Sequence, residues 1–418
     1  MKLSRIGRVS MALVVSAAMT LGMTACGGGT VAYLWVLGIQ YNQIVGFKVD
    51  DFTGNLTQSL HSPYSSNGTN PVSVVVKAGG RYVYVVNKGV PPSGNSAGSP
   101  GNISVFSVGS GGVLTYQTQY TSRGSIPVWA AIDGSGNFLY VLDTLYPDTP
   151  AYPNPNGYGD ITVFAIDSNT GRLQLVPNQQ IKDANQTQLT FFPVGPKPIM
   201  TKLSGSSCLF TVNGGDQTIF PYQIGTNGQL TLTANSTIQT GAGNITSINT
   251  NGNYVYLTDA AATPDSPGGR ILPYTVGGSG SCSLNTLTGG PVNNLALTSN
   301  PTYSMVDAQG RFLYVLNRSS TNSQNPNTSS ISAFTIDQST GKLQPIGSAN
   351  NPYAVGSGPV CMVEDPTKQY IYTSNNIDGN VTGKRINQNN GELSDLQRNS
   401  TFPATGQLTC LTISGNVD

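Results

Sequence analysis

Short runs of alternating hydrophobic and polar residues recur along the chain in a fixed order, and one copy in its second half is especially clear. There, the apolar run Pro301–Val306 is followed by turn-forming residues at 307–311 and by an aromatic-rich run at 312–317. A further run at 331–336 precedes Thr-Gly-Lys-Leu at 340–343. Period-2 patterning with β-branched and aromatic residues indicates strands, so this copy predicts four strands joined by turns.

The same order of elements occurs seven times. Every copy has an aromatic residue in its second predicted strand, namely Trp35, Tyr84, Tyr140, Phe210, Tyr256, Tyr314 and Tyr372. Successive aromatics are 46–70 residues apart. Six copies also have a glycine two residues before a leucine in the last turn, where the fifth copy has Cys282. Repeats of roughly 40–50 residues are typical of β-propeller blades.

We therefore expect an all-β fold, a seven-bladed β-propeller with four-stranded blades, because radial stacking buries both faces of such sheets. The two ends of the chain support this prediction. The first copy lacks a first strand, and the run 408–413 looks like a first strand with nothing after it. Placing this C-terminal strand in the N-terminal blade closes the ring and removes an exposed edge. The alternative is that residues 405–408 form an eighth turn motif.

The first residues are a targeting segment and not part of the fold. Three basic residues precede a short apolar stretch, which is too short to cross a bilayer comfortably. It ends in Met-Thr-Ala-Cys at 23–26, which resembles a bacterial lipobox. The alternative is a plain secretory signal that is cleaved nearby, with Cys26 discarded.

From this resemblance we divide the chain into three parts. Residues 1–25 are expected to be a lipoprotein signal peptide, 26–31 a tether anchored through lipidated Cys26, and 32–418 the propeller. The protein is then exported, as a membrane-anchored lipoprotein of the periplasm or cell surface.

Composition narrows the possible partners. Only 9% of residues are charged, the net charge is +1 and no long charge run occurs, so nothing implies a nucleic acid or an anionic membrane surface. We expect membrane contact through the lipid anchor only. The sequence has no Cys/His spacing for zinc, no calcium loop and no phosphate-binding glycine loop, so we expect no metal and no cofactor.

Four cysteines lie within the predicted propeller, at 208, 282, 361 and 410. An exported compartment permits disulfides, and four cysteines allow three pairings. Ring closure would put Cys361 and Cys410 at equivalent places in the innermost strands of neighbouring blades, which favours a Cys361–Cys410 disulfide. Cys208 and Cys282, from the fourth and fifth blades, then pair by elimination. Four free buried thiols are the alternative.

The repeat unit resembles the seven-bladed lactonase family, which includes proteins similar to 6-phosphogluconolactonase and related cycloisomerases. The resemblance covers nearly all of 32–416 and rests on the Asp-x-x-Gly-Arg-like turn, the Tyr-Val second strand and the Thr-Gly-x-Leu turn. It implies a lactone hydrolase or cycloisomerase with His, Glu and Arg around the channel. No matching residue is found, because the sequence has one histidine, His61, and two glutamates, Glu364 and Glu392.

Residues at the ends of the second strands are candidate ligand-binding groups, because these ends lie on one face around the channel. They are Asn87, Lys88, Asp143, Asp259, Asn317 and Arg318. Acids and bases in one ring could orient a polar or anionic ligand. The alternative is that Asn and Asp here bond to the backbone and start the following loop. Lys77 and Lys202 are further possible channel groups.

The loop at 145–158 is rich in proline and tyrosine. Tyr146 and Tyr152 could form a rigid aromatic surface for a sugar or peptide. The alternative is that this loop packs its tyrosines on its own blades.

Three functions remain open. The shortage of acid–base residues and the predicted anchor favour a non-catalytic propeller that binds a protein, a glycan or a small ligand at the cell envelope. The family resemblance favours a lactone hydrolase or cycloisomerase. A structural surface protein is the third hypothesis, since fold alone constrains function weakly.

Overall fold

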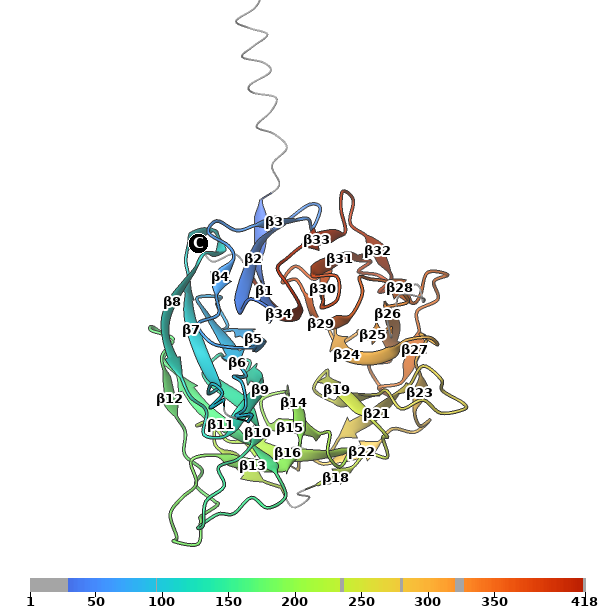
Figure 1. Cartoon of the computed structure of the whole chain (residues 1–418). Helices are drawn as coiled ribbons and strands as arrows, with labels where there is room; N and C mark the ends of the chain where they lie inside the picture. The colour runs from blue at the N-terminus through green and yellow to red at the C-terminus, as the bar shows by residue number, and fades with distance from the viewer. Residues whose placement is uncertain (1–28, 95, 234–236, 279–280, 320–326, 416–418) are drawn as a thin grey trace, which may run out of the picture.

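The computed structural model describes residues 29–94, 96–233, 237–278, 281–319 and 327–415. The expected signal peptide and the lipidation residue Cys26 lie outside these ranges. Seven antiparallel sheets surround a central channel (Figure 1), which confirms the predicted seven-bladed propeller. In the part of the chain so described, no helix is long and apolar enough to cross a membrane, and the short 3-10 segment η1 (Ser110–Gly112) is the one helical element.

Each blade has four strands that follow one another outward from the channel. Blades 1 and 2 consist of β34 (Leu408–Gly415), β1 (Thr30–Gly38), β2 (Gln43–Asp50) and β3 (Leu56–Gln58), and of β5 (Pro71–Val76), β6 (Tyr82–Asn87), β7 (Asn102–Val108) and β8 (Leu114–Tyr120). Blades 3 and 4 consist of β9 (Ser125–Ile132), β10 (Phe138–Leu145), β11 (Tyr158–Ile166) and β12 (Leu173–Leu175), and of β14 (Pro198–Ser204), β15 (Cys208–Asn213), β16 (Thr218–Ile224) and β17 (Leu230–Leu232).

The remaining blades follow the same plan. Blades 5 and 6 consist of β19 (Ile245–Thr250), β20 (Tyr254–Asp259), β21 (Arg270–Val276) and β22 (Leu284–Thr286), and of β24 (Asn300–Val306), β25 (Phe312–Arg318), β26 (Ser330–Ile336) and β27 (Leu343–Pro345). Blade 7 consists of β29 (Pro359–Glu364), β30 (Tyr370–Asn375), β31 (Asn380–Ile386) and β32 (Leu393–Asp395). Every blade except blade 2 has an additional short strand on its third strand: β4 (Tyr64–Ser65), β13 (Phe192–Pro196), β18 (Ile238–Gln239), β23 (Val292–Asn293), β28 (Tyr353–Ala354) or β33 (Thr401–Pro403).

The two ends of the chain meet in blade 1, as expected from the orphan C-terminal run. Strand β34 pairs with β1 in antiparallel register, with Trp35 opposite Thr412, and becomes the innermost strand of that blade. A disulfide joins Cys361 in β29 to Cys410 in β34, across the junction of blades 7 and 1. Residues 405–407 therefore lead into this closing strand and do not begin an eighth blade.

Each junction between neighbouring blades holds its own hydrophobic core, because the cores fill the spaces between sheets and not the channel. The second-strand aromatics that reveal the repeat are all fully buried in these cores. Five of them donate a hydrogen bond to the carbonyl of the turn glycine of the next blade: Trp35 to Gly112, Tyr84 to Gly171, Tyr256 to Gly341, Tyr314 to Gly391 and Tyr372 to Gly54.

In six of the seven blades, a second aromatic ring packs against the turn glycine of the next blade. The ring–glycine pairs are Tyr33 with Gly112, Tyr82 with Gly171, Phe138 with Gly228, Tyr254 with Gly341, Phe312 with Gly391 and Tyr370 with Gly54. Each of these glycines has a positive φ, and a Cβ on any of them would collide with the ring. Glycine is therefore required at this position for both its conformation and its lack of a side chain.

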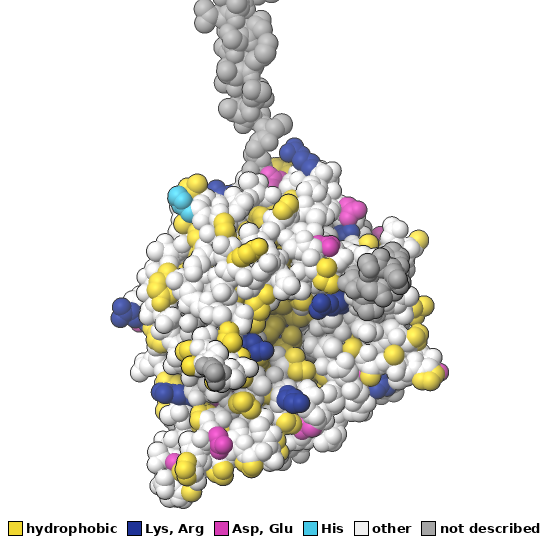
Figure 2. All heavy atoms as spheres, viewed as in Figure 1, with side chains coloured by type: hydrophobic (Ala, Val, Ile, Leu, Met, Phe, Trp, Pro, Cys, Tyr) yellow, Lys and Arg dark blue, Asp and Glu magenta, His cyan; other side chains and the backbone are white. Residues whose placement is uncertain are grey.

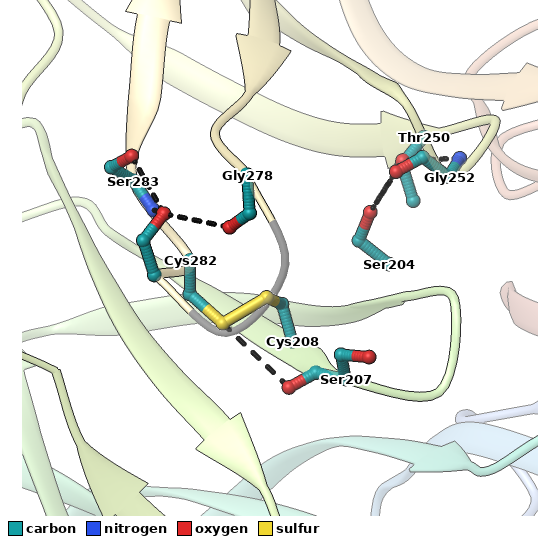
Figure 3. Close-up of a disulfide and its surroundings, with 9 residues drawn as sticks. Ser204, Ser207, Cys208, Thr250, Gly252, Gly278, Cys282 and Ser283 are labelled. Carbon is teal, nitrogen blue, oxygen red and sulfur yellow. Dashed lines mark hydrogen bonds between the residues drawn. A yellow bond between two sulfur atoms is a disulfide. The ribbon is translucent and has the colours of Figure 1, made fainter.

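The junction of blades 4 and 5 is the exception, and a disulfide replaces the ring–glycine pair there. Cys208 occupies the ring position and Cys282 the glycine position, and the two are bonded (Figure 3). Cys282 even keeps the left-handed backbone, with a φ of 46°. Both predicted cysteine pairings are thus confirmed, and the second disulfide has a structural explanation that the sequence did not suggest.

The propeller has two different faces. We call the face where the second strands end and the first strands begin the loop face, and the face with the tight turns between first and second strands the turn face. The turns at Asp133, Asp307 and Asp365 show why acids suit the turn face. One carboxylate oxygen of each accepts two backbone N–H groups, as Asp307 does from Arg311 and Phe312.

Candidate functional site

The ends of the second strands form buried polar corners on the loop face. Asn87 donates from its amide to Asn102 at 2.7 Å and to Ser104 at 3.1 Å. Asn375 donates to Asn380 and Thr382 in the same way, and Asn317 donates to Ser332 at 2.9 Å. These asparagines are fully buried, so their amides connect the second and third strands within a blade and do not face the channel.

In blade 3 the same corner holds two acids. Asp143 and Asp160 lie opposite each other on β10 and β11, and both are fully buried. Burial raises the pKa of Asp143 to about 8, against hydrogen bonds from Ser122, Gly124 and Thr162. Burial, followed by the neighbouring Asp143 charge, also raises the pKa of Asp160 well above its usual range. Two adjacent buried carboxyls cannot both ionise, so the pair retains a proton at neutral pH.

In blade 5, the buried acid at the same corner forms an ion pair with an arginine. Burial raises the pKa of Asp259, but three backbone N–H groups, from Gly243, Asn244 and Ala261, and the Arg270 guanidinium outweigh it. The net effect is a pKa below the usual range. The Nε of Arg270 lies 3.0 Å from Asp259 Oδ2. The Asp259 carboxylate therefore stays ionised and has a structural role, whereas the Asp143 carboxyl gains or loses a proton near neutral pH.

A pocket of about 370 Å³ opens on the loop face between blades 2 and 3, and we call it the loop-face pocket. Lys88 and Ser122 line it, together with prolines of the loop after β6. The Ser122 hydroxyl donates to Asp143 Oδ1 at 2.6 Å, so one side chain of the pocket touches the buried acid pair. Lys88 makes no ion pair with any residue of the described chain.

The backbone of this pocket is strained. Ile126, which lines it, has a φ of +62°, a region that β-branched residues rarely occupy. The equivalent residue before the first-strand proline is Asn70 in blade 2, Lys197 in blade 4 and Gly358 in blade 7. These equivalent residues also have a positive φ, so the left-handed backbone belongs to the connection between blades, and blade 3 is unusual only in placing a β-branched residue there.

Viewed from the loop face, the centre of the ring is hollowed, with a hydrophobic floor and Lys and Arg side chains on its rim (Figure 2). Lys88 and Arg318 are partly exposed at the ends of second strands in blades 2 and 6, the positions predicted for ligand-binding groups. Asn87, Asp143, Asp259 and Asn317 from the same prediction are buried in their corners. A ligand-binding role for this set stays a prediction.

Tyr146 and Tyr152 of the proline-rich loop do not line the loop-face pocket. Tyr146 stacks on Phe191 with ring centroids 5.6 Å apart, and Tyr152 meets both of these rings at 5.3–5.9 Å. The Tyr146 hydroxyl donates to the carbonyl of Pro153. This cluster packs the loop against the segment before β13, and ligand binding by these tyrosines stays a prediction.

The remaining titratable candidates are elsewhere. His61 is exposed in the connection between β3 and β4. Glu364 ends β29 on the turn face, where its carboxylate accepts the Ala308 N–H at 2.6 Å and burial raises its pKa to about 7. Lys77 lies beside Gly136 at the same face, and Lys202 lines the channel. No group of three or more His, Cys, Asp or Glu side chains that could hold a metal occurs among the residues described.

Sequence reasoning missed Ser122 and Asp160. One signal was available: Ser-Arg-Gly-Ser-Ile-Pro at 122–127 matches Ser-Asn-Gly-Thr-Asn-Pro at 66–71 in spacing. That match identifies the segment as the connection between blades. It does not reveal that the serine hydroxyl reaches an acid on the next blade.

Comparisons with known proteins agree with the fold. The chain matches the family model described as "Lactonase, 7-bladed beta-propeller" over residues 29–180 and 274–398. A solved periplasmic gluconolactonase of Pseudomonas aeruginosa is 16% identical, with a TM-score of 0.66 over 93% of this chain and 100% of that chain. A candidate 6-phosphogluconolactonase of Bacteroides fragilis is also 16% identical, with a TM-score of 0.66 over 92% and 98% of the two chains.

A solved protein from Lactobacillus plantarum is 17% identical, with a TM-score of 0.67 over 92% of this chain and 100% of that chain. At such identities these likenesses show the fold alone. No curated protein sequence matches the chain.

Proposed function

The chain belongs to the seven-bladed β-propeller lactonase family, and on that premise we propose that it hydrolyses a lactone in the loop-face pocket. The shortage of acid–base residues in the sequence favours non-catalytic binding, whereas family membership favours lactone hydrolysis. The observation that carries the proposal is the Ser122 hydroxyl, which lines the pocket while donating at 2.6 Å to a buried carboxyl. Such a contact supplies the proton acceptor that ester hydrolysis needs.

The reaction follows from this contact. Water attacks the lactone carbonyl carbon, Ser122 Oγ takes the water's proton, and Ser122 passes its own proton to ionised Asp143. The ammonium of Lys88 stabilises the oxyanion that forms in the pocket. When the intermediate collapses, the ring C–O bond breaks, and the leaving oxygen regains the proton through Ser122. The product is the open-chain hydroxy acid.

The acid pair sets the pH dependence. Asp143 accepts a proton only when it is ionised, and its pKa is raised to about 8. Turnover should therefore rise as the pH increases through this region and should be low below pH 6. A general base with its pKa near the working pH is also the most effective one.

Hydrolysis of D-glucono-1,5-lactone by the purified mature protein tests the proposal, with protein-free blanks at each pH to subtract spontaneous hydrolysis. Ser122→Ala should lower kcat/KM by about 100-fold, the usual size of a general acid–base contribution. Lys88→Met should lower it by about 10- to 100-fold. Ser125→Ala is the matched control, because Ser125 lines the same pocket but makes no hydrogen bond to the acid pair. Equal rates in Ser122→Ala and Ser125→Ala would refute the mechanism.

One observation favours a second function, ligand binding without turnover. Lys88 and Arg318 lie on the loop face, and neither forms an ion pair with a residue that the structure describes. Calorimetry with gluconate would detect binding that Lys88→Met weakens. Binding by a protein that hydrolyses none of a panel of lactones would favour this function, with a small anion, a glycan or a protein as the natural ligand.

We further propose that the protein is exported and lipid-anchored. Two disulfides are typical of an oxidising compartment outside the cytoplasm, and the sequence Met-Thr-Ala-Cys at 23–26 supports lipidation of Cys26. The wild-type protein should fractionate with membranes, and Cys26→Ser should be released in soluble form or remain unprocessed. Membrane association that is unchanged in Cys26→Ser would contradict the anchor.

A further inference from the structure

The channel is lined by residues at the same register position in the seven innermost strands. One ring of such residues lies opposite the second-strand aromatics and consists of Val75, Ala131, Lys202, Asn249, Met305, Val363 and Thr412. Lys202 is the single charged residue in this ring. Ala131, on the adjacent blade, is the smallest residue of the ring.

A cavity of about 410 Å³ surrounds Lys202, and we call it the channel cavity. Two aromatic residues, Trp129 of blade 3 and Tyr303 of blade 6, meet across it with ring centroids 6.3 Å apart. At its other end the cavity reaches Gly134 and Gly205, which belong to the turns of the turn face. It is therefore separate from the loop-face pocket and opens on the opposite side of the ring.

No counter-ion accompanies the lysine. Among the described residues, no hydrogen bond or ion pair involves the Lys202 amine, and no carboxylate lines the channel cavity. The facing Asn249 uses its amide N–H on the carbonyl of Ser304 and its oxygen on the N–H of Thr250. The Tyr303 hydroxyl stays neutral, since burial raises its pKa to about 12. Loss of water around Lys202 lowers its pKa, which increases the share of neutral amine.

We propose that Lys202 captures an aldehyde or ketone in the channel cavity as a covalent imine. The Nζ lone pair attacks the carbonyl carbon to give a carbinolamine, one water molecule leaves, and a C=N bond joins the lysine to the ligand. No oxidant or reductant is required. A lysine whose pKa is lowered by loss of water is activated for this reaction, because the neutral form of the amine is the nucleophile. The rings of Trp129 and Tyr303 would stack on an aromatic or sugar ring of the ligand.

Reductive trapping tests the proposal. Mature protein is incubated at pH 7 with benzaldehyde and cyanoborohydride, and benzylated lysines are located by peptide mass mapping. Lys202 should react faster than the exposed lysines Lys182 and Lys342, because loss of water around its amine lowers its pKa and so increases the share of neutral amine. Lys202→Met should abolish the fast-labelled site and leave slow labelling elsewhere unchanged.

Two results would overturn the proposal. One is labelling spread evenly over the lysines, with Lys202 no faster than the others. The other is benzaldehyde that binds equally well to the wild-type protein and to Lys202→Arg and leaves no reduced adduct on Lys202, because the cavity would then hold the aldehyde without a covalent bond. Lys202→Arg separates the cases, since it keeps a positive charge and cannot form the imine. The result is independent of lactone hydrolysis, which uses the other face.

Discussion

At the scale of single residues, the same corner position acquires opposite properties in different blades. Asp143 and Asp259 both end second strands, yet one lies beside a second acid and the other beside an arginine. Burial next to Asp160 keeps a proton on the first pair, whereas Arg270 and three N–H groups keep Asp259 ionised.

The acid pair predicts how stability depends on pH. Since the folded pKa of Asp143 is raised, the unfolded chain releases the proton first as the pH rises. The contribution of this pair to the free energy of unfolding should therefore be highest below pH 4. It should fall between about pH 4 and pH 8, by about 1.4 kcal/mol for each unit of difference between the folded and unfolded pKa. Asp143→Asn should flatten this fall and raise the melting temperature at pH 8, while removing turnover. Thermal unfolding from pH 4 to pH 9 measures how the melting temperature depends on pH. If that dependence is the same in Asp143→Asn as in the wild-type protein, the prediction is wrong.

Asp160→Asn is the complementary variant. It keeps Asp143 but replaces the neighbouring acid with an amide that donates to the Asp143 carboxylate, as Asn87 donates to Asn102. The pKa of Asp143 should then fall, and the pH profile of lactone turnover should move to lower pH with activity retained. A profile that stays in place would show that Asp143 is not the proton acceptor.

At the scale of elements, the blades are fastened by ring–glycine pairs. A strand aromatic of one blade covers a left-handed glycine in the last turn of the next, and a second aromatic donates to that glycine's carbonyl in five junctions. Blade 4 has Phe210, which has no donor, and blade 5 has Cys282 instead of glycine. The Cys208–Cys282 disulfide fastens this junction in place of both contacts.

The disulfide and the ring–glycine pair should be interchangeable. Replacing both cysteines with serine removes a bridge between residues 74 positions apart and should lower the free energy of unfolding by about 2–4 kcal/mol. The double variant Cys208→Tyr with Cys282→Gly rebuilds the ring–glycine pair and should recover a measurable part of that loss. Denaturant unfolding of the two double variants decides the question. A tyrosine–glycine variant no more stable than the serine variant would show that the positions are not equivalent.

At the scale of the whole molecule, the ring is closed by the chain's own end. Strand β34 supplies the innermost strand of blade 1 and carries Cys410, which is bonded to Cys361 of blade 7. Side-chain contacts reinforce the closure on both sides, since Thr409 donates to the carbonyl of Pro71 and Ser374 donates to that of Thr409. Closure removes the open edge that a propeller would otherwise expose.

A chain that ends at Gln407 should lose the single cooperative unfolding transition, because blade 1 then lacks its inner strand and both neighbours lose packing. The control is Cys361→Ala with Cys410→Ala, which removes the disulfide but keeps β34. This control should lose about 2–4 kcal/mol and still unfold in one transition. Calorimetry distinguishes the two, and one sharp transition in the truncated chain would contradict the role assigned to β34.

The sequence by itself determined the architecture, and it favoured the cysteine pairing that the structure confirms. The number of blades and the closure of the ring follow from a local, repeated pattern of strands and turns. Because the repeats can be aligned with one another from the sequence, Cys361 and Cys410 are recognised as equivalent residues of neighbouring blades. Only the tertiary structure revealed the Ser122–Asp143–Asp160 contact, the Trp129–Tyr303 pair and the isolation of Lys202. These features depend on which side chains different blades bring together and on how deeply they are buried. Burial sets the pKa of an acid or amine, and no spacing along the chain records it.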